Sequence, residues 1–114
     1  MEQMTLKQIC ESVGVSRRSI QCYEKAGLMK PTDKNKYGYL LYDTNALHRA
    51  ELIRFMQELG FKLKDIKEII DAPKTVMREA LEKRVKELEI EVERINQIII
   101  EASAYMENIE NSEC

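Results

Sequence analysis

A long row of apolar residues at helical spacing dominates the second half of the chain. After Pro73, steps of four and three residues alternate through Leu81, Val85, Leu88, Val92, Ile95, Ile99, Ala102, Met106 and Ile109. We call these nine residues the seam. Heptad spacing of this kind is typical of a coiled coil, and about 37 residues without Gly or Pro would make a helix roughly 55 Å long. A helix of that length cannot bury its seam against a small domain of its own chain, so residues 73–114 are predicted to be a dimerisation helix.

Charge is distributed unevenly along the 114 residues. The net charge of -2 argues by itself against a nucleic-acid-binding protein, because neutralising phosphates requires clustered Lys and Arg. Residues 1–72, however, hold 12 basic and 10 acidic residues, whereas residues 73–114 hold 6 and 10. Within residues 16–49, seven basic residues stand against three acidic ones. A basic surface is therefore expected in the first part of the chain.

Two short helices joined by a glycine turn are predicted near the N-terminus. Thr5 and Gln8 have the spacing of a capping box, which begins a helix. Gly14 can supply the positive φ of a tight turn, and Ser16 is a good N-cap for a second helix that runs to about Ala26. This order of elements indicates a helix-turn-helix.

The next segment predicts a small β-hairpin followed by two helices. Polar residues from Thr32 to Tyr37 precede the aromatic and apolar stretch 38–42, which favours a hairpin. Apolar residues on one face predict a helix from Thr44 until Gly60, and residues 63–70 predict a short helix that Pro73 closes. The fold class expected is mainly α with a small β-hairpin wing: a winged helix-turn-helix DNA-binding domain over residues 1–72, followed by the long helix.

Several short segments, taken in order, resemble the MerR family of bacterial transcription regulators. They are Gly14-Val15-Ser16, Tyr23-Glu24, Gly27-Leu28, Lys30-Pro31, Gly38-Tyr39, Tyr42 and Leu59-Gly60-Phe61. Each segment is common alone, but their joint order followed by a seam helix is specific. The resemblance covers roughly residues 4–71.

The resemblance implies how such a protein works. A homodimer places two recognition helices in successive major grooves of an inverted-repeat operator, and its wings grip the flanking phosphates. The bound promoter is bent and untwisted, which realigns it for RNA polymerase, an indirect partner. In this family the helices after the head usually pair antiparallel, so the seam would fix the separation of the two heads and hence of the half-sites.

The second helix carries residues suited to reading DNA. Arg17, Gln21 and Lys25 lie at i, i+4 and i+8, with Arg18 beside them. Arg and Gln can contact base edges, and Lys and the hairpin tyrosines can contact the sugar-phosphate backbone. The candidate DNA-binding residues are Ser16, Arg17, Arg18, Gln21, Tyr23, Lys25, Lys34, Lys36, Tyr37, Gly38, Tyr39 and Lys64.

Three positions depart from the family pattern. Gln21 and Cys22 stand where the family usually has Arg and Tyr, and Leu40 stands where the wing usually has Arg. Losing two phosphate-binding arginines predicts weaker or differently specified binding. Lys36, Lys62 and Lys64 are candidates to replace these contacts. A rival interpretation is a dimeric interaction module with the same fold and weak or no DNA binding.

Other classes of function find little support in the sequence. No nucleophile is paired with a base and no phosphate-binding loop appears, so an enzyme is not expected. Cofactors and metals are not expected either, because the three cysteines lack metal-ligand spacing and His48 stands alone. Without a membrane span or signal peptide, the expected location is the cytoplasm.

A few single residues admit two interpretations. Cys10 is expected to be a buried inert thiol, and Cys22 is expected to pack. Phe55 lies outside the apolar face of its helix, where it is either an incidental exposed aromatic or a contact with the partner's helix. No separate effector domain is expected after the seam, and mutating Cys114 to Ser is expected to leave DNA binding unchanged.

Overall fold

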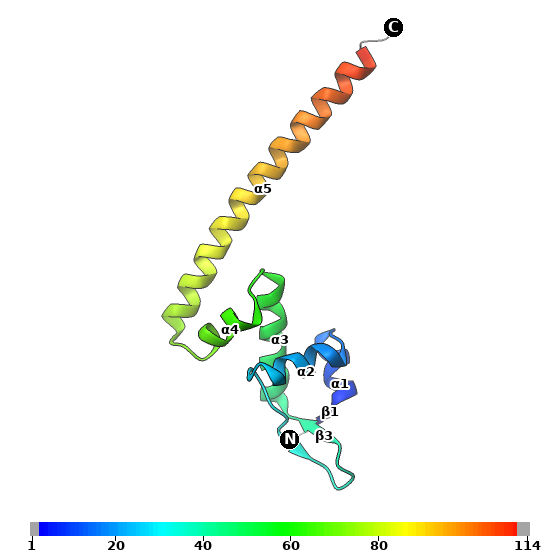
Figure 1. Cartoon of the computed structure of the whole chain (residues 1–114), viewed down its shortest axis with the longest axis vertical. Helices are drawn as coiled ribbons and strands as arrows, with labels where there is room; N and C mark the ends of the chain where they lie inside the picture. Colours follow the sequence, from blue (N-terminus) through cyan, green and yellow to red (C-terminus); the bar gives the residue numbers. More distant parts are fainter. Residues whose placement is uncertain (1–2, 112–114) are drawn as a thin grey trace. The chain divides into compact units, whose positions relative to one another are not determined.

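The computed structural model describes residues 3–111 and divides the chain into two compact units that meet between Pro73 and Lys74. The first unit, which we call the head, contains three short strands and four helices, and the second is a single helix (Figure 1). Among the described residues, no helix is long and apolar enough to cross a membrane.

Helices α1 (Leu6–Val13) and α2 (Arg17–Lys25) begin where their capping residues predict. The Thr5 side chain accepts a hydrogen bond from the Gln8 backbone N–H, and the Gln8 side chain accepts one from the Thr5 N–H, which completes the capping box. Between the helices, Gly14 has a φ of 81°, a left-handed conformation that only glycine adopts without strain. The predicted helix-turn-helix is confirmed.

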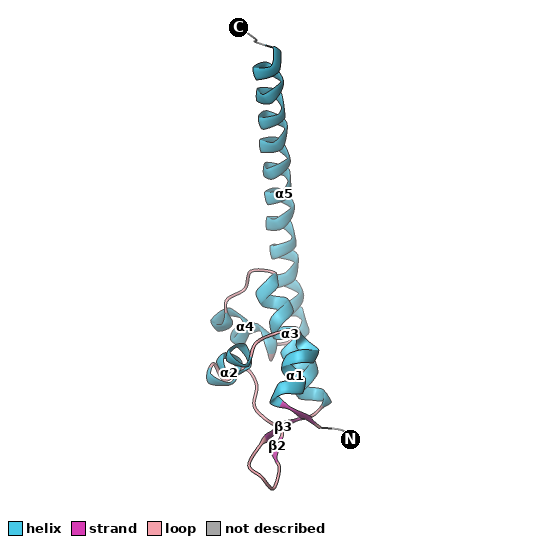
Figure 2. Cartoon of the chain, turned by 90° about the vertical axis from the view of Figure 1, so that its right-hand side faces the viewer, coloured by secondary structure: helices cyan, strands magenta, loops and turns pink. Residues whose placement is uncertain are grey.

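The small sheet contains one strand more than the predicted hairpin. Strands β2 (Asp33–Lys34) and β3 (Leu40–Tyr42) pair antiparallel, as expected, and β1 (Met4–Thr5) adds to the other edge of β3. The resulting order is β1-β3-β2, and Figure 2 shows the strands in magenta. Because β1 leads directly into α1, the sheet ties the first helix to the base of the hairpin.

Helices α3 (Thr44–Glu58) and α4 (Leu63–Ile70) complete the head. Asp43 caps α3 by accepting a hydrogen bond from the Ala46 N–H at 2.9 Å. The predicted apolar face of α3 is buried at Ala50, Ile53 and Met56, and α4 contributes Ile66. The remaining core residues come from α1, α2, the segment that follows α2, and β3: Ile9, Cys10, Val13, Ile20, Tyr23, Leu28, Met29 and Tyr42.

Two buried tyrosines connect the recognition helix to the rest of the head. The Tyr23 hydroxyl donates to Gln57 Oε1 of α3 at 2.8 Å, and the Tyr42 hydroxyl donates to Glu24 Oε2 at 2.5 Å. Burial, together with the hydrogen bond to Glu24, raises the pKa of Tyr42 far above its usual range. Both hydroxyls therefore stay protonated as donors, and hydrogen bonds join α2 to both β3 and α3.

Helix α5 (Lys74–Asn111) forms the second unit and is continuous over its 38 residues (Figure 1). None of its described residues is buried. The helix gains some support from ion pairs one turn apart, such as Arg78 with Glu82 at 2.9 Å. Exposed pairs of this kind contribute only about 0.3–0.5 kcal/mol each, so they do not account for a helix of this length.

Candidate nucleic-acid interface

Helix α2 separates its polar and apolar side chains cleanly. Arg17, Arg18, Gln21 and Lys25 are all exposed, while Ile20 and Tyr23 of the same helix are buried. The four polar residues thus form a continuous face that a DNA groove could receive. Because α2 is fixed through its buried side, this face is presented by a rigid element.

Tyr23 does not join this face, although it was among the candidate DNA-binding residues. Its side chain is only 1% exposed and its hydroxyl is bonded to Gln57. Burial also raises the pKa of the Tyr23 hydroxyl. Tyr23 positions α2 from within the core rather than offering a surface to a ligand.

Ser16 lies at the start of α2 and is used there as a cap. Its Oγ accepts a hydrogen bond from the Ser19 N–H at 3.1 Å and lies 3.2 Å from Ser19 Oγ. The side chain is nevertheless exposed. Its first role is therefore to set where the recognition helix begins.

The hairpin between β2 and β3, which we call the wing, presents two aromatic side chains. Tyr37 and Tyr39 are 73% and 66% exposed, and the Lys36 ammonium lies 5.1 Å from the centre of the Tyr37 ring. Asn35 shapes the tip, because its Oδ1 accepts hydrogen bonds from the N–H groups of Tyr37 and Tyr39 at 2.9 and 3.0 Å. Exposed rings beside a cation suit contact with a sugar-phosphate edge.

Gly38 and Lys34 complete the predicted wing. Gly38 has a φ of 85° and a Cβ there would meet no atom within 4 Å, so conformation rather than space selects glycine. Lys34 is exposed on β2. Both lie in the wing, and their contact with DNA stays a prediction.

A hollow in the head brings the wing and the recognition helix together. It is lined by residues from β1, α1, α2 and the wing: Thr5, Leu6, Lys7, Arg17, Gly38, Tyr39 and Leu40. Arg17 and Tyr39, 22 positions apart in sequence, thereby border one surface. Lys7 adds a second cation that sequence reasoning missed, since an exposed lysine early in a helix carries no pattern of its own.

Lys64 is available at the surface, whereas Arg49 is bonded within the head. Lys64 is exposed in the first turn of α4 and remains a candidate, as does Lys62 just before that helix. Arg49, one of the seven basic residues counted in residues 16–49, donates instead to the Leu28 carbonyl and to both carboxylate oxygens of Asp71 at 2.8 Å. It is part of the fold and reduces the charge available for DNA.

The cysteines differ in exposure. Cys10 is buried, as expected, and burial raises the pKa of its thiol. Cys22 is exposed, so the expectation that it packs is wrong: it follows Gln21 on the outward side of α2. Cys114 lies outside the described residues. Among residues 3–111, no group of three or more His, Cys, Asp or Glu side chains could hold a metal ion.

His48 and Phe55 lie on the surface of α3. His48 is exposed, and Phe55 is about half exposed. Both interpretations of Phe55 therefore remain open.

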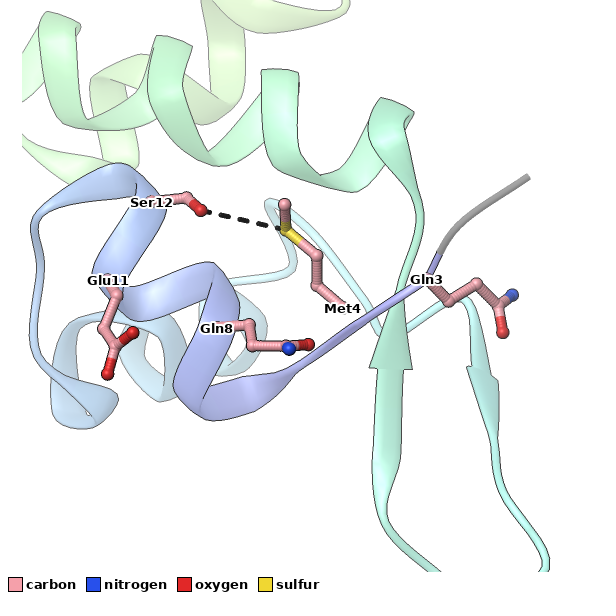
Figure 3. A pocket seen from close by; sticks show the side chains of 5 residues that line it. All are labelled: Gln3, Met4, Gln8, Glu11 and Ser12. Carbon is pink, nitrogen blue, oxygen red and sulfur yellow. Dashed lines mark hydrogen bonds between the residues drawn. The ribbon is translucent and has the colours of Figure 1, made fainter.

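A second hollow lies between β1 and α1, where the Ser12 hydroxyl points toward the Met4 sulfur at 4.0 Å (Figure 3). Its lining residues are Gln3, Met4, Gln8, Glu11 and Ser12. They include a carboxylate and no cation, which makes this surface unsuited to phosphate.

The seam residues lie along α5 with their side chains accessible. Val85, Val92, Ile95, Ile99, Met106 and Ile109 are about half exposed, Ala102 is exposed, and Leu81 and Leu88 are partly covered. So many accessible apolar side chains on one helix are unusual for a surface in water. The prediction that they bind a second chain stays a prediction.

Comparison with known proteins identifies the head. Residues 4–73 match the MerR HTH family regulatory protein profile, and residues 47–101 match the profile described as MerR, DNA binding. The chain is 34% identical over 94 residues to the HTH-type transcriptional activator mta of Bacillus subtilis, covering 82% of this chain and 37% of that protein. It spans about two fifths of the length of the curated relatives that match it first.

Solved structures agree with this similarity. The N-terminal part of the Bacillus subtilis multidrug transporter activator, MtaN, has a TM-score of 0.72 at 31% identity, covering 90% of this chain and 97% of that one. HiNmlR, a MerR family regulator lacking the sensor domain and bound to promoter DNA, has a TM-score of 0.76 at 22% identity, covering 97% and 95%. At 22% identity the second likeness shows the fold alone.

Proposed function

We propose that this chain, which belongs to the MerR family of helix-turn-helix regulatory proteins, regulates bacterial transcription by binding promoter DNA as a homodimer. Residues 1–72 form the DNA-binding domain and residues 73–114 the dimerising helix, paired antiparallel as the family resemblance implies. The operator is an inverted repeat, and the bound promoter is bent and untwisted for RNA polymerase in the cytoplasm. Related proteins act as transcriptional regulators, which supports a role in regulation rather than catalysis.

The hollow between α2 and the wing is the observation that carries this proposal. Arg17 and Lys7 provide two cations there, and Tyr39 provides an exposed ring with a hydroxyl. A helix face and a wing that border one surface can contact a groove and its phosphates together. That HiNmlR shares this fold and binds promoter DNA supports the same use of the head.

The interaction module remains the second candidate function. Gln21 and Cys22 leave the middle of the recognition face without a cation, and Leu40 does the same at the wing. If these positions abolish DNA affinity, the dimer would bind another protein instead.

Selection of genomic fragments followed by salt titration distinguishes the DNA-binding regulator from the interaction module. The purified chain should enrich an inverted repeat between promoter elements, with affinity that falls steeply as salt rises. Arg17→Ala should reduce the log-log salt slope by about 2 per dimer, one phosphate contact for each protomer. Arg94→Ala is the matched control, because it removes an exposed arginine from α5 away from the seam and should leave the slope unchanged.

Two results would contradict the proposal. A dimer that enriches no DNA at moderate salt would favour the interaction module. Equal salt slopes for the native chain and Arg17→Ala would show that DNA binds elsewhere than at this hollow.

A further inference from the structure

Helix α5 also carries exposed apolar side chains outside the seam, at Val76, Ile90, Ile98, Ile100 and Tyr105. In heptad numbering, Val85, Val92, Ile99 and Met106 are the a positions of the seam, and its other residues are d positions. The g positions that immediately precede these a positions are Arg84, Glu91, Ile98 and Tyr105. Ile98 and Tyr105 are 50% and 68% exposed. Between Leu81 and Ile109, the g row is therefore charged at its first two positions and apolar at its last two.

We infer that α5 pairs antiparallel with a second copy in one register, in which each a or d residue i lies opposite residue 187−i of the partner. The inference rests on the proposed dimer and adds its register. The two-fold axis then passes between Glu93 and Arg94. Opposite each other lie Leu81 and Met106, Val85 and Ala102, Leu88 and Ile99, and Val92 and Ile95. Every a position from 85 to 106 thus meets an apolar d position of the partner, as an antiparallel coiled coil requires.

The flanking rows fit this register as well. In an antiparallel pair g faces g of the partner, so Arg84 lies beside the partner's Tyr105 and Glu91 beside the partner's Ile98. The Arg84 side chain, which contacts Glu87 at 3.5 Å within its own helix, can also lay its guanidinium against a tyrosine ring. On the e side, Glu82 and Glu89 face the partner's Ser103 and Asn96, so no two carboxylates oppose each other.

Shifting the register by one heptad removes these advantages. In the first shifted register, the sum of two opposed seam numbers is 180 instead of 187. Glu91 then lies opposite the partner's Glu91, and Glu89 opposite the partner's Glu89. Ala102 and Met106 lie opposite Arg78 and Lys74. The other shift sets Glu82 opposite the partner's Glu110 and shortens the overlap of the two helices by seven residues, about 10 Å. Opposed like charges destabilise a coiled coil.

A parallel pair explains the surface less well. It would place Arg84 near the partner's Glu89, which is favourable, but it would stack Ala102 on the partner's Ala102 and leave that layer underfilled. Parallel geometry also sets g opposite e, so Ile98 and Tyr105 would face the partner's Ser103 and Glu110. Tyr105 would then lose the partner's Arg84 as its neighbour.

Disulfide cross-linking tests the register in the full chain. In a background with Cys22→Ser and Cys114→Ser, where Cys10 is buried, Val85→Cys combined with Ala102→Cys should give a covalent dimer that reduction reverses. The two positions lie 17 residues apart on one rigid helix, so no bond within one chain can form between them. A disulfide needs Cα atoms within about 7 Å, less than the displacement of one heptad.

The controls make each outcome decisive. Val85→Cys with Ile95→Cys, and Val85→Cys with Ile109→Cys, report the two shifted registers and should not cross-link; a covalent dimer with either would overturn the inferred register. Ala102→Cys alone would cross-link only in a parallel pair. A dimeric mass without any cross-link would also reject this register, whereas a monomeric mass for the native chain would reject the proposed dimer itself.

Discussion

At the residue scale, Arg49 shows how a cation in the basic part of this chain serves the fold. Its guanidinium donates to the Leu28 carbonyl, just after α2, and to Asp71, just after α4. The arginine itself belongs to α3, so one side chain connects three segments. The bidentate bond raises the pKa of Arg49, which therefore stays charged. This contact helps to fix the end of the recognition helix.

The Arg49–Asp71 contact makes stability depend on pH. Hydrogen bonds from Arg49 lower the pKa of Asp71, so its stabilising effect is fully present above the pKa of the unfolded chain, about 4. The effect is lost as pH falls through the lower folded-state pKa. We expect Asp71→Asn to lower the midpoint of urea unfolding at pH 7, modestly because the carboxylate is exposed. The difference from the native chain should shrink below about pH 4, as circular dichroism can measure.

Glu58→Gln provides the control for losing an exposed ion pair, since Glu58 contacts Arg54 at 2.9 Å on the surface of α3. It should move the unfolding midpoint less than Asp71→Asn does at pH 7. If the Asp71→Asn difference stayed constant down to pH 3, the charge of Asp71 would not be its cause.

Individual side chains were the least predictable part of the site. Arg49 was counted as surface charge because its partners lie 21 and 22 residues away in sequence. Tyr23 was included with the DNA contacts, whereas its hydroxyl bonds to Gln57, 34 residues away. Such partners depend on how the helices pack, and no local pattern reports them.

At the element scale, helix ends were predictable where capping residues mark them. Thr5, Ser16 and Asp43 each begin a helix at the expected place, because an N-cap satisfies backbone N–H groups locally. Strand β1 escaped prediction, since two residues carry no periodicity and their pairing with β3 is made across the fold. The helices and turns were thus predictable, and the third strand was not.

The wing offers a prediction at the same scale. Asn35→Ala removes the acceptor for the Tyr37 and Tyr39 amides, each bond being worth about 1 kcal/mol. Hydrogen exchange of these two amides, followed by NMR, should become roughly fivefold faster while the core is unaffected. Asn35→Asp keeps the acceptor and should preserve slow exchange. Unchanged exchange in Asn35→Ala would mean that strand pairing alone orders the tip.

At the scale of the whole molecule, the two units are stabilised by different means. The head buries a core that includes two tyrosines with satisfied hydroxyls. Helix α5 has no buried residue among those described, and isolated helices depend on packing for most of their stability. We therefore expect the head to fold by itself and α5 to need a partner along its seam.

Two isoleucines on α5 allow the same substitution to be made inside and outside the seam, which tests whether α5 needs a partner there. Ile95 is a seam residue, 45% exposed, and Ile90 lies on the outer side of the helix, 67% exposed. Ile95→Lys removes two apolar contacts from each dimer, each worth about 1.5–3 kcal/mol, and should weaken dimerisation at least roughly 100-fold. Light scattering should then report a monomer, and circular dichroism should report lost helix.

Ile90→Lys makes the same chemical change outside the seam and should leave the chain dimeric and fully helical. A head that still unfolds cooperatively in Ile95→Lys would show that the loss is confined to α5. DNA binding to both half-sites should then fall in Ile95→Lys alone, because a monomer presents only one recognition helix. If the two variants behaved alike, α5 would be stabilised by something other than its seam, and the dimer would have to form through another surface.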